Sequence, residues 1–370
     1  MIDGVLRDRR VVVCCGAGGV GKTTVSAALG LALARRGHRV AVVTIDPARR
    51  LASALGLEHL GDEPHRIAAA DAGPGELWAL QLDAKATFDR LVARYAPAPE
   101  AAERIYANRI YRHLSGAVAG SQEYMAVERL NELTEDGRFD RIVLDTPPAQ
   151  NALDFLEAPE RITRFIEGRG LRLLMRGPSG GPGRLGWKVL HVGSSTVLSV
   201  LERLTGAQLL RDIGDFLRDF EGMYAGFAAR ADAVRELLRS DDAAFVVVAA
   251  PLDQPVQEAI ALAGRLREDD LPLAAVVLNR MRPAPPDGVP DLEDLAALLA
   301  GAGAADPAGL AARAAAQLGQ DRTRAATDRR ARDVLAEGAG ADVLVEVPEL
   351  AEEPVEVEGL ARVAAELTRA

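Results

Sequence analysis

The sequence predicts a doubly wound α/β fold on a mostly parallel sheet, and three observations predict it. An apolar run at residues 11–15 leads through a glycine-rich loop into an alanine-rich helical pattern. Similar continuous apolar runs recur along the chain, which is typical of parallel strands covered on both faces. Asp46 and Asp145 directly follow two of these runs, at the edge of the sheet where such folds bind ligands.

Each further element follows from a local pattern. Residues 23–36 are rich in alanine and leucine and Gly37 follows them, so we expect a helix that ends at this glycine. Strands are expected at short apolar runs bounded by turn or helix signals. Those runs are residues 39–45, 77–82, 141–144, 245–250, 274–278 and 342–347.

The middle of the chain is expected to be an insertion. Residues 1–150 and 241–370 would form the sheet core, and residues 151–240 a helical insertion subdomain. Glycine and proline at 176–186 predict a loop inside it, and apolar residues beyond that loop share one broad helical face. These are Leu198, Leu201, Leu204, Leu209, Ile213, Phe216, Phe220, Tyr224 and Phe227. The face either packs on its own domain or forms a groove for an apolar client protein, and the sequence leaves both open.

The C-terminal part predicts two helices after a flexible region at residues 282–288. Both helical stretches are rich in alanine, with an interruption around residues 301–307. The second helix, at about 308–337, carries mixed charges that include Asp328. We expect these charges to lie on a solvated face.

Composition narrows the function classes. The 370 residues carry a formal net charge of −10, which argues against indiscriminate binding to nucleic acid or anionic lipid. No apolar run approaches the roughly twenty residues that cross a bilayer, and the N-terminus lacks the apolar core of a signal peptide. We therefore expect a cytoplasmic protein with no integral membrane span and no nucleic-acid partner.

Cys14 and Cys15 are the only cysteines in the chain. Neighbouring strand residues point to opposite faces, so the two thiols cannot readily share one metal ion. We expect both to be small, buried core residues, and a disulfide framework or a zinc knuckle within one chain is excluded.

The glycine-rich loop at residues 16–24 reads GAGGVGKTT and fits the pattern G-x-x-x-x-G-K-[ST]. Glycines let the backbone curl around a phosphate chain, and the following helix adds the positive end of its dipole. Lys22 is expected to reach the β- and γ-phosphates, and the Thr23 hydroxyl to hold Mg²⁺. The sequence therefore predicts a nucleotide-binding site.

Three motifs together resemble the ArsA family of ATPases. They are GAGGVGKTT, TIDPARRLASALGL at residues 44–57 and LDTPP at residues 144–148. The resemblance extends to residues 278–280 and 347–350 and so spans the whole chain. This family contains arsenite-pump ATPases and ATPases that target tail-anchored membrane proteins.

The resemblance implies ATP and Mg²⁺ as cofactors and a set of site residues. It assigns catalytic roles to Lys22, Asp46 and Asp145, and nucleotide contacts to Gly18, Gly19, Val20, Gly21, Lys22, Thr23, Thr24, Asn279, Pro348 and Leu350. Asp46 would position the attacking water, and Asp145 would sit in the outer Mg²⁺ shell. Asn279 would contact the adenine, helped by backbone near Pro348 and Leu350. As the alternative, Asp46 and Asp145 each cap a turn before a nearby proline.

Ala17 departs from the family pattern, which usually has a lysine there, as in GKGGVGKT. In the family this lysine reaches across a dimer to the phosphates held by the partner chain, where it neutralises transition-state charge. Three answers stay open: Arg49 or Arg50 substitutes in cis or in trans, the chain forms a heterodimer with a lysine-bearing paralogue, or it is a slow nucleotide switch. We favour the heterodimer, because Thr23, Asp46 and Asp145 are retained.

The leading function is a dimeric ATP-driven targeting or chaperone-like enzyme whose insertion holds an apolar client. Arsenite transport needs soft thiolate ligands, and the two strand cysteines do not supply them. A partitioning-type ATPase and an inactive ATP-sensing scaffold remain as alternatives.

Overall fold

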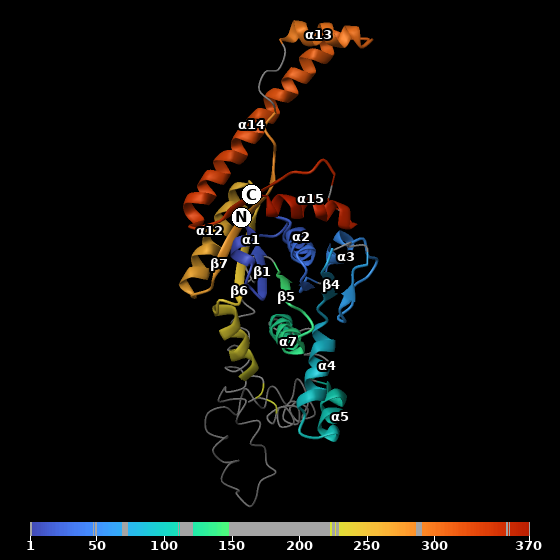
Figure 1. Cartoon of the computed structure of the whole chain (residues 1–370), viewed down its shortest axis with the longest axis vertical. Helices are drawn as coiled ribbons and strands as arrows, with labels where there is room; N and C mark the ends of the chain where they lie inside the picture. The colour runs from blue at the N-terminus through green and yellow to red at the C-terminus, as the bar shows by residue number, and fades with distance from the viewer. Residues whose placement is uncertain are drawn as a thin grey trace, which may run out of the picture.

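The computed structural model describes residues 2–46, 48, 50–68, 73–109, 111, 121–147, 223, 226, 229–285, 291–352, 354 and 356–369. These residues form an eight-stranded sheet in the order β3-β4-β2-β5-β1-β6-β7-β8 (Figure 1). The strands are β1 Val11–Gly16, β2 Arg39–Thr44, β3 His65–Arg66, β4 Glu76–Gln81, β5 Arg141–Asp145, β6 Ala243–Ala249, β7 Leu273–Met281 and β8 Leu344–Pro348. All neighbouring pairs are parallel except β3 with β4.

Both faces of the sheet are covered, because successive strand residues point to opposite sides. Val12 and Cys14 of β1 join the apolar core beneath α2 and α15, and Val11, Val13 and Cys15 join the core on the other face. The first core is covered by α1 Ile2–Leu6, α2 Lys22–Arg35, α3 Arg50–Ala54 and α15 Glu356–Thr368. The second is covered by α4 Ala84–Tyr95, α5 Pro99–Ala107, α7 Ser121–Asp136 and α12 Asp253–Glu268. The predicted doubly wound α/β fold is confirmed.

Each strand predicted from an apolar run is present, with ends that shift by a few residues. The predicted first helix is α2, and Gly37 lies just beyond its end with a φ of 97°. The two-residue strand β3 has no apolar signal, since both of its residues are exposed. β7 runs further than predicted, through Asn279 to Met281, because β8 pairs with it there.

The connection between β4 and β5 is helical and consists in part of α4, α5 and α7. Most of the predicted insertion lies outside the described residues, including the loop at 176–186 and the apolar series from Leu198 to Phe227. Residues 229–239 form a helix whose Ala231, Val234 and Leu238 pack into the second core. The division into a core and an insertion subdomain therefore stays a prediction.

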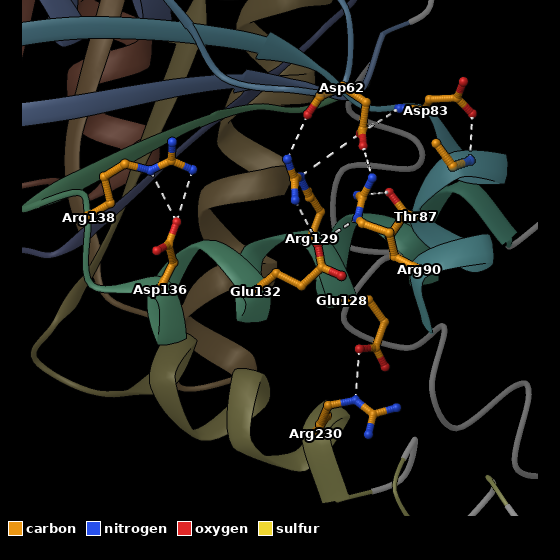
Figure 2. A network of polar contacts seen from close by, with 11 residues as sticks. Asp62, Asp83, Thr87, Arg90, Glu128, Arg129, Glu132, Asp136, Arg138 and Arg230 are labelled. Carbon is orange, nitrogen blue, oxygen red and sulfur yellow. Dashed lines mark hydrogen bonds and ion pairs between the residues drawn. The ribbon is translucent and has the colours of Figure 1, made fainter. Parts of the chain in front are cut away.

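Ion pairs join α4 and α7 to the turn before β3 (Figure 2). The Asp62 carboxylate lies 2.5 Å from Nη1 of Arg90 on α4, and the Asp62 carbonyl oxygen accepts a hydrogen bond from Nη2 of Arg129 on α7 at 2.6 Å. Arg90 and Arg129 also pair with the same carboxylate oxygen of Glu132. This network fixes the two helices at one end of the sheet.

A second ion pair attaches the helix at 229–239 to α7. Nε of Arg230 lies 2.9 Å from the buried Glu128 carboxylate, and its guanidinium lies 3.8 Å from the ring centre of Tyr95. The Tyr124 hydroxyl donates to the other Glu128 oxygen. Burial raises the pKa of Glu128, and the hydrogen bonds from Tyr124 and Arg230 oppose that shift.

The two predicted C-terminal helices are α13 Leu292–Gly301 and α14 Pro307–Ala339, and they pack against each other. Figure 1 shows this hairpin extending away from the sheet, while the end of α14 lies along α12. The expectation that Asp328 faces solvent is wrong. Its side chain is fully buried and accepts hydrogen bonds from the backbone N–H of Arg282 at 2.9 Å and from its guanidinium at 2.7 and 3.0 Å. A carboxylate can lie inside because a charged partner satisfies it there.

Arg282 was expected to begin a flexible region, and this contact fixes it instead. Residues 286–288 of that region lie outside the described residues. In the described part of the chain, no helix combines the length and apolar character needed to cross a bilayer.

Candidate functional site

The phosphate-loop motif lies between β1 and α2, at the carboxyl edge of the sheet. Glycine is required at two of its positions. A Cβ on Gly16 would lie 2.1 Å from the carbonyl oxygen of Val248, so only glycine lets β1 and β6 approach this closely. Gly21 has a φ of 92°, and a Cβ there would lie 2.3 Å from the Asn279 side chain. The two glycines therefore fix the shape of the turn.

The first turn of α2 is suited to an anion. Gly21 is its N-cap, and no side chain caps the helix among the described residues. The first turn holds no acidic side chain, while Lys22 and Thr23 begin the helix. Unpaired N–H groups and the positive end of the helix dipole therefore meet at the predicted phosphate site.

Lys22 folds back over the loop. Its buried ammonium donates a hydrogen bond to the carbonyl oxygen of Ala17 at 2.8 Å. Burial lowers the pKa of Lys22, and the nearby carboxylate of Asp145 opposes that shift. In this buried position the Lys22 ammonium bonds to a neutral carbonyl oxygen, so the electrostatic attraction of an anionic phosphate would stabilise it strongly.

Asp145 joins three segments of the site. Its Oδ2 accepts hydrogen bonds from the hydroxyl of Thr23 at 2.8 Å and from the hydroxyl of Thr44 at 2.9 Å. Its side chain is 1% exposed, and its buried Oδ1 has no hydrogen-bond partner among the described residues. Burial raises the pKa of Asp145 to about 6, although the two hydroxyls and Lys22 act in the opposite direction.

This arrangement fits Mg²⁺. Hard divalent cations prefer oxygen ligands, and Mg²⁺ commonly keeps several waters while it is bound by few protein groups. The hydroxyl of Thr23 and the unpartnered Oδ1 of Asp145 supply such oxygens at the head of α2. The described residues contain no cluster of three or more His, Cys, Asp or Glu side chains that would form a separate metal site.

Asp46 lies close to this centre but is engaged in a turn. Its Oδ1 accepts a hydrogen bond from the backbone N–H of Ala48 at 2.9 Å, and its Oδ2 lies 3.8 Å from Nη1 of Arg50. The turn-capping alternative thus describes the contact in this structure. Arg50 therefore lies beside Asp46, and Arg49 lies outside the described residues.

Asn279 reaches the loop from β7. Its Nδ2 donates a hydrogen bond to the carbonyl oxygen of Val20 at 2.9 Å. Pro348, the last residue of β8, is in register with Met281 on the adjacent strand. Leu350 lies two residues further on and packs against the core on the α2 face. The structure therefore brings Asn279 to the loop and places Pro348 on the strand beside it.

Both cysteines are fully buried, as expected for core residues. Burial raises the pKa of Cys14 to about 12 and raises that of Cys15 further. The two thiols lie on opposite faces of β1, in different parts of the core. They therefore form no common thiolate site for a soft metal or metalloid.

Two residues of the site were not predicted. Thr44 was seen only as part of a strand and a motif, although a hydroxyl that ends an apolar strand was an available signal. Arg280 donates a hydrogen bond from Nη1 to the carbonyl oxygen of Gly19 at 3.2 Å. No local pattern indicates that contact, because it depends on how β7 meets the loop.

Comparison with known proteins agrees with this geometry. The family model described as anion-transporting ATPase matches residues 9–175, which contain the loop, Asp46 and Asp145. Protein Rv2184c of Mycobacterium tuberculosis is 33% identical over 175 residues, ATPase ARSA1 of Chlamydomonas reinhardtii 26% over 302 residues, and the arsenical pump-driving ATPase of Escherichia coli 32% over 171 residues.

These matches are partial on both sides. They cover 45%, 74% and 45% of this chain, respectively, and 41%, 35% and 28% of the three relatives. The chain thus spans less than half the length of each of these relatives. The matched region nevertheless carries the phosphate loop and both predicted aspartates in the setting that the structure shows. Residues 9–175 are thus similar to the ATPases that this family model describes.

Proposed function

We propose that this chain binds ATP with Mg²⁺ and hydrolyses it. The observation that carries the proposal is the junction at Asp145, where Thr23 of the loop helix and Thr44 of β2 both donate to one carboxylate oxygen. The similarity of residues 9–175 to ArsA-family ATPases supports it, since that family binds ATP with Mg²⁺. Phosphoryl transfer depends mainly on positioning and charge neutralisation, and these residues can provide both.

Each residue has a distinct role in this proposal. Lys22 would exchange the Ala17 carbonyl for phosphate oxygens, and the backbone N–H groups of the loop would hold the remaining phosphate charge. Thr23 would ligate Mg²⁺, and Asp145 would orient Thr23 and accept from metal-bound water. Asp46 would leave its turn contact with Ala48 to position the attacking water.

Asn279 would select the adenine base. Its amide nitrogen already donates to Val20, which leaves its Oδ1 as an acceptor. Adenine presents an amino donor where guanine presents an oxygen, so an acceptor at this position favours adenine. Backbone near Pro348 and Leu350, on the neighbouring strand, would complete the contact.

The active form would be a dimer, as is general in the ArsA family. Ala17 has an uncharged side chain, so it supplies no cation to a partner. It is 4% exposed and packs in the core. A paralogue with lysine at the equivalent position would complete the site from outside. In a homodimer, Arg50 is a described candidate for the missing charge, since it already lies beside Asp46.

The insertion at 151–240 would hold an apolar client during the nucleotide cycle. The support is the apolar series from Leu198 to Phe227 in the sequence. Crosslinking of the Asp46→Asn variant to labelled hydrophobic helices tests this part. Equal capture after deletion of residues 198–227 would rule out the groove and favour an ATPase without such a client.

Turnover assays test the enzymatic part. We expect slow MgATP hydrolysis by the chain alone, faster hydrolysis with a lysine-bearing paralogue, and none with Lys22→Ala. Nucleotide binding without turnover in any mixture would instead favour the scaffold alternative.

A further inference from the structure

Arg280 occupies an irregular position in the sheet. Residues of β7 and β8 pair in register up to Asn279 with Val347, but the next pair joins Met281 to Pro348. Arg280 is the extra residue, and its φ is 63°. A bulge of this kind redirects a side chain, and a non-glycine residue keeps a positive φ only where its surroundings hold it.

Contacts on both sides hold this bulge. On one side, Asn279 donates to the carbonyl oxygen of Val20. On the other side, Arg282 donates three hydrogen bonds to the buried carboxylate of Asp328 on α14. Between them, the exposed Arg280 directs its guanidinium to the carbonyl oxygen of Gly19 at 3.2 Å.

These contacts orient two successive peptide groups of the loop. In a trans peptide, the C=O and N–H groups point in opposite directions. Because Arg280 holds the Gly19 oxygen, the N–H of Val20 points away from β7, and Asn279 orients the N–H of Gly21 in the same manner. Gly19 and Gly21 have φ values of 78° and 92°, and glycine backbones can rotate at low cost without such restraints.

We propose that Arg280 is a positioning residue of the nucleotide site, which holds the Gly19–Val20 peptide with its N–H group directed at the bound phosphates. This inference rests on the proposed function, because it requires a phosphate chain in the loop. It needs no contact between Arg280 and the nucleotide. The bulge in β7 then restrains the loop through its carbonyl oxygens, on the side opposite the proposed phosphates.

The test compares two substitutions at positive φ. Arg280→Gly removes the guanidinium while glycine retains the backbone conformation. We expect its MgATP affinity, measured by calorimetry, to fall about tenfold, the size typical of one lost charge-assisted hydrogen bond. Arg280→Lys keeps a positive charge, so its MgATP affinity should fall less than that of Arg280→Gly. The matched control is Asp270→Gly. Asp270 is exposed, has a φ of 56° and lies just before the start of β7, so the variant should bind MgATP like the unmodified chain.

A second readout separates positioning from general damage. Adenosine has no phosphates, so its affinity should be the same for Arg280→Gly and the unmodified chain, and the thermal midpoint of the nucleotide-free protein should be retained. Equal losses for adenosine and MgATP would overturn the inference. So would unchanged MgATP affinity in Arg280→Gly while Lys22→Ala loses binding, a result that leaves the proposed function intact. If the unmodified chain itself bound no MgATP, the proposed function would fail.

Discussion

The hydroxyl of Thr23 donates a hydrogen bond to Oδ2 of Asp145 across 2.8 Å and so joins the start of α2 to the end of β5. The parallel register of β1 and β5 places Asp145 beside Cys14, two residues before the end of β1, and so brings its carboxylate close to the loop. Thr44 of β2 donates to the same oxygen at 2.9 Å. The junction therefore links two strands, β2 and β5, to the loop helix through one buried carboxylate.

The first prediction concerns the stability of the nucleotide-free protein. Burial raises the pKa of Asp145 from 3.8 to about 6, so its ionised form is disfavoured in the folded state. Its contribution to stability is present below the unfolded value and is lost as pH rises through about 6. Above pH 6, the free energy of unfolding of Asp145→Asn, measured with urea, should therefore exceed that of the unmodified chain by up to about 3 kcal/mol. The difference should vanish in acid. Equal stability at neutral pH would contradict this assignment.

The second prediction concerns the pH dependence of binding. A proton on Asp145 competes with the positive charge at the site, so Mg²⁺-dependent nucleotide affinity should fall as pH drops below about 6. Calorimetric titrations over this range measure the effect. Asp145→Asn should bind more weakly and lack this dependence. A parallel pH profile in the variant would assign the titration to another group.

The third prediction separates the two threonines. Thr23→Val removes both the hydrogen bond to Asp145 and the proposed Mg²⁺ ligand, whereas Thr44→Val removes only a hydrogen bond to the same oxygen. We expect Mg²⁺ to strengthen ATP binding in Thr44→Val but not in Thr23→Val, with recovery in Thr23→Ser. The measurement is ATP affinity with and without Mg²⁺. Identical behaviour of the two valine variants would argue against Thr23 as the ligand.

The fourth prediction compares a buried and an exposed ion pair in Figure 2. Glu128→Ala leaves Arg230, which is mostly buried, without its carboxylate, and should lower the free energy of unfolding by about 3 kcal/mol. Asp136→Ala breaks an exposed pair with Arg138 and should cost about 0.5 kcal/mol. Urea unfolding of both variants provides the comparison. Similar costs would show that the Glu128 pair does not hold the helix at 229–239 in place.

Local patterns predicted much of this fold. The apolar run of β1, the glycine-rich turn and the helix α2 follow one another in the sequence, so their pattern is readable without tertiary structure. The meeting of Thr23 and Asp145 was also foreseeable in outline, since the carboxyl ends of parallel strands share one edge.

Contacts that depend on tertiary packing were not predictable. Arg280 meets Gly19 only because β7 bulges beside β8, and a bulge leaves no mark in hydrophobic periodicity. In the sequence, Asp328 resembles the other charged residues of a polar helix. Its burial follows from the packing of α14 beside Arg282, which no local pattern indicates. Asp46 was assigned by resemblance, and its present contact with Ala48 is one that a turn aspartate also makes.

Calorimetry with MgATP tests the central claim most directly, with the unmodified chain and Lys22→Ala compared at neutral pH. The account predicts saturable binding by the unmodified chain that depends on Mg²⁺, and its loss in a Lys22→Ala protein that still unfolds cooperatively. Absence of binding by the folded, unmodified chain, alone or together with a lysine-bearing paralogue, would contradict it.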